Sequence, residues 1–305
     1  MGTPLLWLAF NLFVVAAVAL DLGALHRRAH KVSLREAVRW TALWVGLSVA
    51  FGFGVALYAG QQKSLEFFTG YVIEKALSVD NLFLFLVIFR AFRVDEEVQH
   101  RVLEWGILGA LLMRGLMIAL GAELIRRFEW ILYALGAFLV FAGLHMFFTR
   151  KKEQHPERSA VSRFASKHLR VATEGQGARF FVRQNGKLLA TPLLVVLLVI
   201  EITDITLAVD SIPAIFGITR DAFLVYTSNV FAILGLRAMY FLLAGVLNRL
   251  RFLTAGLSVV LVFIGGKMIA EPWLHISTGT SLAIVAGILL VALGASLFWE
   301  ARARG

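Results

Sequence analysis

Long apolar segments recur along the whole chain and constrain what it can fold into. Each is about 20 residues long, the length that an α-helix needs to cross the hydrocarbon core of a bilayer. Only 16% of the residues are charged, whereas a soluble domain would carry about a quarter. The sequence therefore predicts an all-α, polytopic membrane protein with about nine transmembrane helices. The predicted spans are 4–25, 37–60, 66–90, 103–123, 129–148, 190–217, 222–247, 252–271 and 280–299.

Basic residues gather between the predicted spans and set the expected orientation. Residues 150–189 hold ten Lys or Arg and three Glu, and further basic residues lie in 26–39, 249–251 and 302–304. Because basic loops stay on the cytoplasmic side, they predict an outer N-terminus and an inner C-terminus. An odd number of spans agrees with this. No known nucleic-acid-binding module accompanies the charge, so we expect no nucleic-acid partner.

The residue types and patterns that the sequence lacks exclude several kinds of chemistry. There is no cysteine, so disulfides, thiolate metal sites and cysteine catalysis are excluded. No His-Glu-x-x-His, Gly-x-Ser-x-Gly or Walker A pattern occurs. We therefore expect no enzyme activity and no prosthetic group.

The chain divides into two membrane halves joined by a polar segment. We place the N-terminal half at 1–149, a basic cytoplasmic loop at 150–189 and the C-terminal half at 190–305. Within the loop, Asn185-Gly186 predicts a short β-hairpin with a type I′ turn. The simplest role of this loop is to connect the halves.

Two similar motifs, 130 residues apart, place carboxylates inside predicted spans. The first, at 74–81, reads EKALSVDN, and the second, at 204–211, reads DITLAVDS. Each carboxylate in hydrocarbon costs several kcal/mol, so the duplicated motif predicts a bound ion or partner charges.

The repeat extends beyond the motifs. Arg114-Gly-Leu-Met parallels Arg237-Ala-Met-Tyr, and VFAGLHM at 140–146 parallels VFIGGKM at 262–268. The unit is three spans long, so predicted spans 3–5 and 6–8 form a 3+3 repeat. Three crossings reverse the direction of the chain, which makes the two copies inverted. Inverted repeats with polar, interrupted helices near the midplane are typical of secondary transporters.

If the motifs meet across the repeat axis, their oxygen atoms form a candidate metal site. Oxygen ligands suit hard divalent cations such as Mn²⁺, Mg²⁺ or Ca²⁺. The two carboxylates of each motif are separated by six residues, or about 240° around an ideal helix. We therefore expect helices that are broken or kinked at the motifs, with Pro213 contributing in the second copy. The candidate ligands are Glu74, Asp80, Asn81, Glu201, Asp204 and Asp210.

A simpler alternative is that the acids form ion pairs with basic residues, and some such pairs are expected in either case. Lys75 is a candidate counter-charge for the empty site. Asp21 either lines an entrance or belongs to a solvated helix end. The residues that we assign to gating or charge pairing are Asp21, Lys75, Ser78, Ser211, Arg114 and Arg237.

Segment 201–214, EITDITLAVDSIPA, resembles the signature of the TerC family of integral membrane proteins, and 74–81 resembles its first-half partner. Asp21-Leu-Gly, 182–192 and 217–221 match as well, and the Alx-like branch is the most similar. The resemblance implies an inner (plasma) membrane protein of the LysE-like transporter superfamily, linked to manganese efflux and, by name, to tellurite resistance. Tellurite is an anion that an acidic site would repel, so any tellurite phenotype should be indirect.

These observations predict an exporter of a divalent cation, with Mn²⁺ favoured, that works by alternating access. Export against 100 mV costs about 4.6 kcal/mol per divalent cation, from roughly 2.3 per charge. With no nucleotide-binding motif, inward-moving protons are the expected counter-ions. The alternative is a non-transporting membrane scaffold or insertion partner that docks proteins with residues 150–189.

Overall fold

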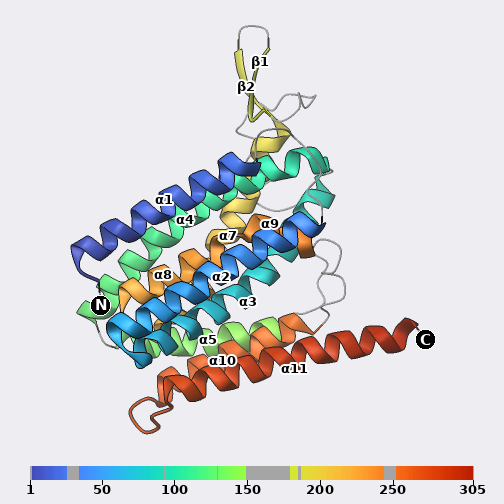
Figure 1. The fold of residues 1–305 in the computed structure, drawn as a ribbon. Coiled ribbons are helices and arrows are strands. Elements are labelled where there is room, and N and C mark those ends of the chain that lie inside the picture. The colour runs from blue at the N-terminus through green and yellow to red at the C-terminus, as the bar shows by residue number, and fades with distance from the viewer. Residues whose placement is uncertain are drawn as a thin grey trace.

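The chain folds into a bundle of helices with one small β-hairpin (Figure 1). The computed structural model describes residues 2–25, 34–92, 94–128, 130–148, 179–184, 187–243 and 252–304. Five helices precede the hairpin: α1 Pro4–Leu25, α2 Leu34–Ala59, α3 Gln61–Ala91, α4 Glu96–Arg127 and α5 Ile131–Phe148. Five follow it: α7 Pro192–Phe216, α8 Ala222–Ile233, α9 Leu236–Leu243, α10 Leu253–Ala270 and α11 Thr278–Arg304.

Each of the nine apolar segments overlaps a helix, and 222–247 overlaps both α8 and α9. By length and composition, six helices of the described part could cross a membrane, or seven if the bent pair α8–α9 forms one span. The helices that meet this test singly are α2, α4, α5, α7, α10 and α11. A polytopic all-helical membrane protein is thus the observed class, whereas nine membrane spans remain a prediction.

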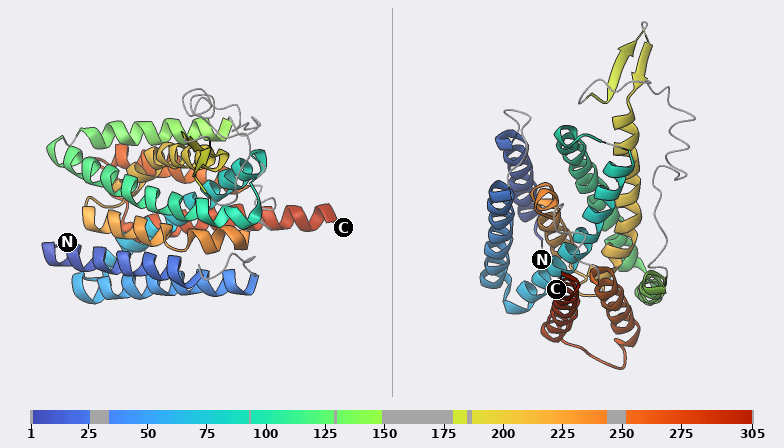
Figure 2. Two further views of the ribbon diagram at one scale, coloured as in Figure 1. Left: turned by 90° about the horizontal axis from the view of Figure 1, so that it is seen from above. Right: turned by 90° about the vertical axis from the view of Figure 1, so that its right-hand side faces the viewer.

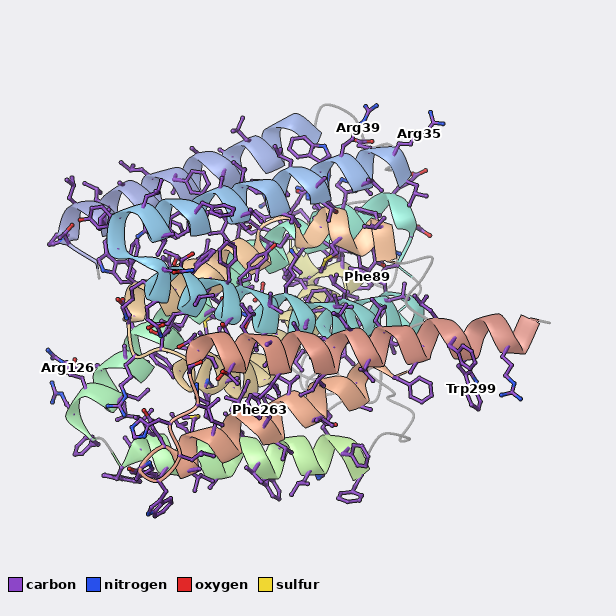
Figure 3. The ribbon with its side chains drawn as sticks, turned by 60° about the horizontal axis from the view of Figure 1, so that its bottom comes forward. Arg35, Arg39, Phe89, Arg126, Phe263 and Trp299 are labelled. Atoms are coloured by element: carbon purple, nitrogen blue, oxygen red, sulfur yellow. The ribbon has the colours of Figure 1, made fainter. Side chains whose placement is uncertain are left out.

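The helices run side by side, and the two termini lie at opposite ends of the bundle (Figures 1 and 2). Arg35, Arg39 and Trp299 lie at the end where the C-terminus is found, and Arg126 lies at the other (Figure 3). Large apolar side chains such as Leu57, Phe148 and Val291 are exposed on the flanks. Apolar exposure of this kind is costly in water and favourable in lipid, as expected for a protein embedded in a bilayer.

Helices α5 and α10 approach each other closely because both carry glycine at the contact. A Cβ atom on Gly265 would lie 2.5 Å from the Gly136 carbonyl oxygen, and one on Gly143 would lie 2.7 Å from the Ser258 carbonyl oxygen. Small residues at helix contacts are a common means of packing in membranes, where burial from water contributes little.

Strands β1 Phe181–Gln184 and β2 Lys187–Ala190 form an antiparallel pair in which Phe181 faces Ala190 and Gln184 faces Lys187. This is the hairpin expected around Asn185-Gly186, with those two residues outside the described part. The Thr191 side chain donates hydrogen bonds to the carbonyl oxygens of Arg179 and Phe180 at 2.7 and 3.2 Å. The hairpin therefore leads directly into α7.

The prediction of helices broken at the two motifs is wrong. Helix α3 is continuous across 74–81, and α7 is continuous across 204–211 with Pro213 inside it. The break lies instead between α8 and α9, which are bent by 40°. Gly235 adopts φ +82° there, a conformation that glycine reaches at little cost. Proline near the end of α7 removes one backbone donor without ending the helix.

Candidate functional site: a buried charge cluster

Arg114 of α4 joins the two motifs. Its Nε donates to Asp204 Oδ2 at 3.1 Å and its Nη2 to Asp204 Oδ1 at 3.0 Å, while Nη1 donates to Glu74 Oε1. Glu74 and Asp204 are the first carboxylates of the two motifs. The exposed fractions are 1% for Arg114, 0% for Glu74 and 5% for Asp204. The guanidinium group thus holds matching acids of both repeat copies in the protein interior.

Asn81 completes this cluster from the next turns of α3. The Asn81 amide is oriented so that both its nitrogen and its oxygen have hydrogen-bond partners. Its Nδ2 donates to the Leu77 carbonyl oxygen at 3.0 Å, and its Oδ1 accepts from Arg114 Nη2 at 3.2 Å. Three further oxygen atoms of the motifs are buried without a hydrogen-bond partner in the described part of the chain: Glu74 Oε2, Ser78 Oγ and Ser211 Oγ. The motifs therefore hold more oxygen acceptors than Arg114 satisfies.

The cluster lies between two apolar regions. One apolar region includes Ile73 and Leu77 of α3 and Ala208 of α7. The other includes Leu82 of α3 and Ile200 of α7. Asp204 is 12 residues from either end of α7, or about 18 Å at 1.5 Å per residue. Charges at such depth interact more strongly than in water, and each needs a partner.

Among the described residues, no hydrogen bond of the cluster includes Glu201 or Asp210, although Glu201 lies one turn before Asp204 and interacts with its charge. Glu201 is half-buried and packs against α4, where a Cβ on Gly109 would lie 2.1 Å from Glu201 Oε1. Asp210 is half-buried further along α7 and, because α7 is continuous, lies on a different face from Asp204. The backbone of Asp80 lies in α3, but its side chain is outside the described part. Among the described residues, no group of three or more His, Asp and Glu is arranged to hold a metal ion.

Lys75 points away from the cluster, unlike the counter-charge that the sequence suggests. Its Nζ donates to the carbonyl oxygen of Ala232 in α8 at 3.1 Å. Adjacent residues of a helix face directions about 100° apart, so Glu74 and Lys75 serve different neighbours. Asp21 lies in α1 with its side chain outside the described part.

Arg237 forms a second buried ion pair, with Glu104 of α4 at 3.1 Å. Sequence reasoning named Arg237 but missed Glu104. The available signal was a lone acid, ten residues before Arg114, at the start of an apolar segment. A fourth buried acid, Glu66, accepts from Thr219 Oγ1 at 2.6 Å and pairs with Lys63 at 2.8 Å. Its hydrogen bond fixes the α7–α8 connection onto α3.

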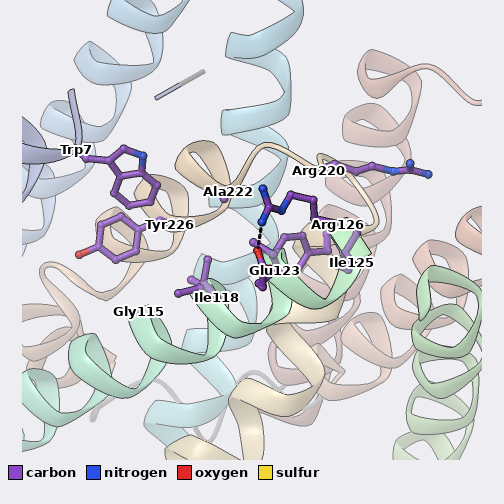
Figure 4. Close-up of a pocket in the computed structure, with 12 residues that line it drawn as sticks. Trp7, Gly115, Ile118, Glu123, Ile125, Arg126, Arg220, Ala222 and Tyr226 are labelled. Atoms are coloured by element: carbon purple, nitrogen blue, oxygen red, sulfur yellow. Dashed lines mark ion pairs between the residues drawn. The ribbon is translucent and has the colours of Figure 1, made fainter. Parts of the chain in front are cut away.

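A cavity of about 580 Å³ opens beside α4 (Figure 4). Its lining includes Arg126, which lies at the end of the bundle opposite the C-terminus (Figure 3). Trp7 and Tyr226 lie on one side and the ion-paired Glu123 and Arg126 on the other. Its lining reaches Gly115, the residue after Arg114. The cavity therefore extends along α4 to the level of the buried cluster.

The fold and this cluster define an integral, multi-pass membrane protein with paired acidic and basic side chains buried among its helices. The chain belongs to the TerC family of integral membrane proteins, whose family model matches residues 59–304.

Similar proteins occur in several bacteria. An uncharacterized membrane protein of Myxococcus xanthus is 49% identical over 297 residues, covering 97% of this chain and 93% of that protein. Alx of Salmonella typhi, named as a proposed membrane-bound redox modulator, is 47% identical, with 96% and 94% covered. Alx of Escherichia coli K12 is 46% identical, with 95% and 94% covered. No solved structure matches this chain.

Proposed function

We propose that this protein exports a divalent metal cation, with Mn²⁺ favoured, through the site formed by Glu74, Asp204 and Asn81, and that protons are the counter-ions. The observation that carries the proposal is the meeting of matching acids from both motifs on Arg114, with Glu74 Oε2 left without a partner among the described residues. Buried ionisable residues facing the interior of a membrane protein commonly mark the route of an ion.

The charges of the cluster suit a divalent substrate. Glu74 and Asp204 together carry two negative charges, and Arg114 neutralises one of them. If Arg114 withdraws, a divalent cation neutralises both, and the amide and hydroxyl oxygens of Asn81, Ser78 and Ser211 are available as further ligands. Hard divalent cations accept such all-oxygen sets. Arg114 then acts as an internal substitute for the substrate.

The packing of the helices supports the inverted repeat. Helix α3 packs along α8 as α7 packs along α4, while α5 pairs with α10 and α3 with α7. If α3 is exchanged with α7, α4 with α8 and α5 with α10, the same set of helix contacts is obtained, as a repeat of three helices requires. Alternating access is often a movement of one repeat against the other around a fixed central site.

The cavity beside α4 is a candidate release route on the outer side. Its lining carries Arg126 and Arg220 with Glu123 as the single carboxylate. This assignment follows the predicted orientation, with the N-terminus outside.

A redox role, as in the names of the Alx relatives, would have to be indirect. The chain has no cysteine, so thiol–disulfide exchange is not available to it. The proposed export activity would affect the redox state of the cell by controlling the level of a redox-active metal.

Flux of Mn²⁺ in proteoliposomes under an imposed pH gradient tests the proposal. We expect Glu74→Gln and Asp204→Asn to abolish flux, because each removes one of the two charges that balance the cation. Asp80→Ala and Asp210→Ala extend the test to the second carboxylates. Glu97→Gln is the control, because Glu97 is an exposed acid at the start of α4, outside both the cluster and the lining of the cavity. Wild-type flux in both cluster variants would overturn the site.

The scaffold alternative depends on residues 150–189, most of which lie outside the described part. Deletion of residues 157–178 distinguishes an exporter from a scaffold. A scaffold should lose its function, whereas an exporter should keep Mn²⁺ flux.

A further inference from the structure

Asn229 of α8 is a buried polar residue whose side chain is not satisfied within the described part of the chain. It is 1% exposed, and neither its Oδ1 nor its Nδ2 has a hydrogen-bond partner there. Its neighbours on α8 differ. The hydroxyl group of Thr227 donates to the Leu224 carbonyl oxygen at 3.3 Å, and that of Ser228 donates to the Val225 carbonyl oxygen at 3.1 Å. Because an amide without partners is costly to bury, Asn229 calls for a functional explanation.

The direction of the Asn229 side chain follows from its neighbours on α8. Tyr226 faces α4, since a Cβ atom on Gly115 would lie 3.4 Å from its ring (Figure 4). Ser228 faces α3, since a Cβ atom on Gly70 would lie 2.9 Å from its Oγ. At about 100° per residue, Asn229 points about 60° from Tyr226 and about 100° from Ser228, within the arc between them. The amide is therefore directed between α3 and α4, the two helices that the ion pairs of the cluster join.

The depth of Asn229 in the bundle matches that of the cluster. Helix α8 crosses both of the apolar regions between which the cluster lies: Val225 belongs to one and Ile233 to the other. Asn229 is four residues from each, and side chains at this spacing share a helix face. Asp204 has the same spacing on α7, four residues from a member of each region. Asn229 is thus the polar residue that α8 places at the level of the buried acids.

The amide oxygen of Asn229 adds a neutral ligand to the oxygen atoms that Arg114 leaves unsatisfied. Among the described residues, those atoms are Glu74 Oε2, Ser78 Oγ and Ser211 Oγ. Carboxylate and amide oxygens both bind hard divalent cations. Because an amide is neutral, it adds a ligand without changing the balance between two carboxylates and a divalent ion.

We propose that Asn229 is a further ligand of the transported cation, and that its Oδ1 binds the cation when Arg114 withdraws. This inference rests on the proposed export activity and adds α8 to the helices that form the site. Helices α4 and α8 are counterparts in the repeat, yet their contributions differ. Arg114 neutralises the acids of the empty site, whereas Asn229 coordinates the cation that replaces it.

Two measurements on the purified full chain in detergent test the proposal: equilibrium binding of Mn²⁺, and the thermal unfolding midpoint without Mn²⁺. We expect Asn229→Leu to weaken Mn²⁺ binding at least about tenfold, since even groups that only orient metal ligands affect affinity about 10–100-fold. The midpoint without Mn²⁺ should not fall, because leucine has a similar volume and replaces an amide without partners. In proteoliposomes, the Mn²⁺ concentration that gives half-maximal flux should rise as well.

Thr227→Val is the matched control. Thr227 is also buried on α8 but points about 160° away from Asn229, so this variant should bind Mn²⁺ as the wild-type protein does. Asn229→Asp keeps an oxygen atom at the same position and should bind Mn²⁺ more tightly than Asn229→Leu. If Asn229→Leu does not fold, Asn229→Ala takes its place, with the same weakening expected.

Wild-type Mn²⁺ affinity in the Asn229→Leu or Asn229→Ala variant would overturn the role of Asn229 and leave the export activity intact. Equal loss of affinity in Asn229→Leu and Asn229→Asp would also overturn it, because the oxygen atom would then make no difference. Equal loss in Asn229→Leu and Thr227→Val would do the same, since any change within α8 would then weaken binding. Absence of both Mn²⁺ binding and Mn²⁺ flux in the wild-type protein would overturn the export activity itself and, with it, this assignment.

Discussion

Arg114 binds Asp204 through two parallel N–H···O bonds, of 3.1 and 3.0 Å, although the two residues are 90 positions apart in the chain. The fork of the guanidinium group matches the two oxygen atoms of a carboxylate, and this geometry makes such pairs strong and directional. Its third nitrogen reaches Glu74. One side chain of α4 thus connects α3 and α7.

Removing Arg114 should destabilise the protein strongly. Arg114→Gln leaves two carboxylates buried without a compensating charge, and breaking a buried pair in this way costs about 3–5 kcal/mol. Thermal unfolding in detergent measures the loss. Adding Glu74→Gln and Asp204→Asn to Arg114→Gln should restore part of the stability, since the uncompensated charges are then gone. Arg126→Gln, at an exposed pair, should change little.

The Arg237–Glu104 pair should show strong energetic coupling. Both side chains are nearly buried and 3.1 Å apart, so a double-mutant cycle with Arg237→Gln and Glu104→Gln should give about 0.5–3 kcal/mol. The comparison pair is Arg220 and Glu271, which are 3.9 Å apart and more than half exposed. Its coupling should be close to zero. Equal coupling in the two pairs would contradict the importance that we assign to burial.

Two adjacent glycines of α10 should respond in opposite ways to alanine. Gly265→Ala places a methyl group 2.5 Å from the Gly136 carbonyl oxygen and 2.8 Å from the Val140 backbone nitrogen, so α5 and α10 must separate. Overpacking of this kind costs about 1–3 kcal/mol. Gly266→Ala meets no atom within 4 Å and should be neutral or slightly stabilising, because alanine favours the helix. Unfolding midpoints of the two variants in the same detergent compare them directly.

Gly235 should tolerate alanine less well than Gly60 does. Both have positive φ, +82° and +91°, which costs an alanine about 1–2 kcal/mol. At Gly60 no atom lies within 4 Å, whereas at Gly235 the new Cβ would lie 2.6 Å from Trp44 Cδ1. The difference in unfolding midpoint between the two variants measures the contribution of the Trp44 contact. Equal losses would show that backbone strain alone accounts for the glycine.

The predicted orientation can be tested with single cysteines, because the chain has none of its own. In intact cells, His275→Cys, between α10 and α11, should react with a membrane-impermeant thiol reagent. Arg302→Cys, near the C-terminus, should react only after the membrane is opened. Both positions are exposed. The reverse labelling pattern would show an inner N-terminus and an outer C-terminus.

Much of the architecture can be predicted from the sequence because it is encoded locally. Apolar segments of membrane-spanning length identify the helical regions, and Asn185-Gly186 identifies the β1–β2 hairpin. The repeated motif likewise identifies Glu74 and Asp204 as buried acids of special importance. Arg114 appears among the expected charge partners, since basic residues inside apolar segments are rare.

Other features are not encoded locally. Proline predicts a break in α7, yet the break occurs at Gly235 between α8 and α9, against Trp44 of α2. The partner of Lys75 is a backbone carbonyl of α8, and no side-chain pattern indicates a carbonyl. The pairing of Glu104 with Arg237 spans 133 residues, so it too depends on how α4 and α9 pack.

By itself, the sequence determines that this is an all-helical membrane protein of the TerC family with two acidic motifs. Burial of apolar segments in lipid and the cost of charge there are properties of each segment alone. Only the tertiary structure decides that Glu74 and Asp204 meet on Arg114, while Lys75 turns to the end of α8. The physical reason is that a buried charge takes whichever partner packing brings within hydrogen-bond distance, and that distance is set by how the helices cross.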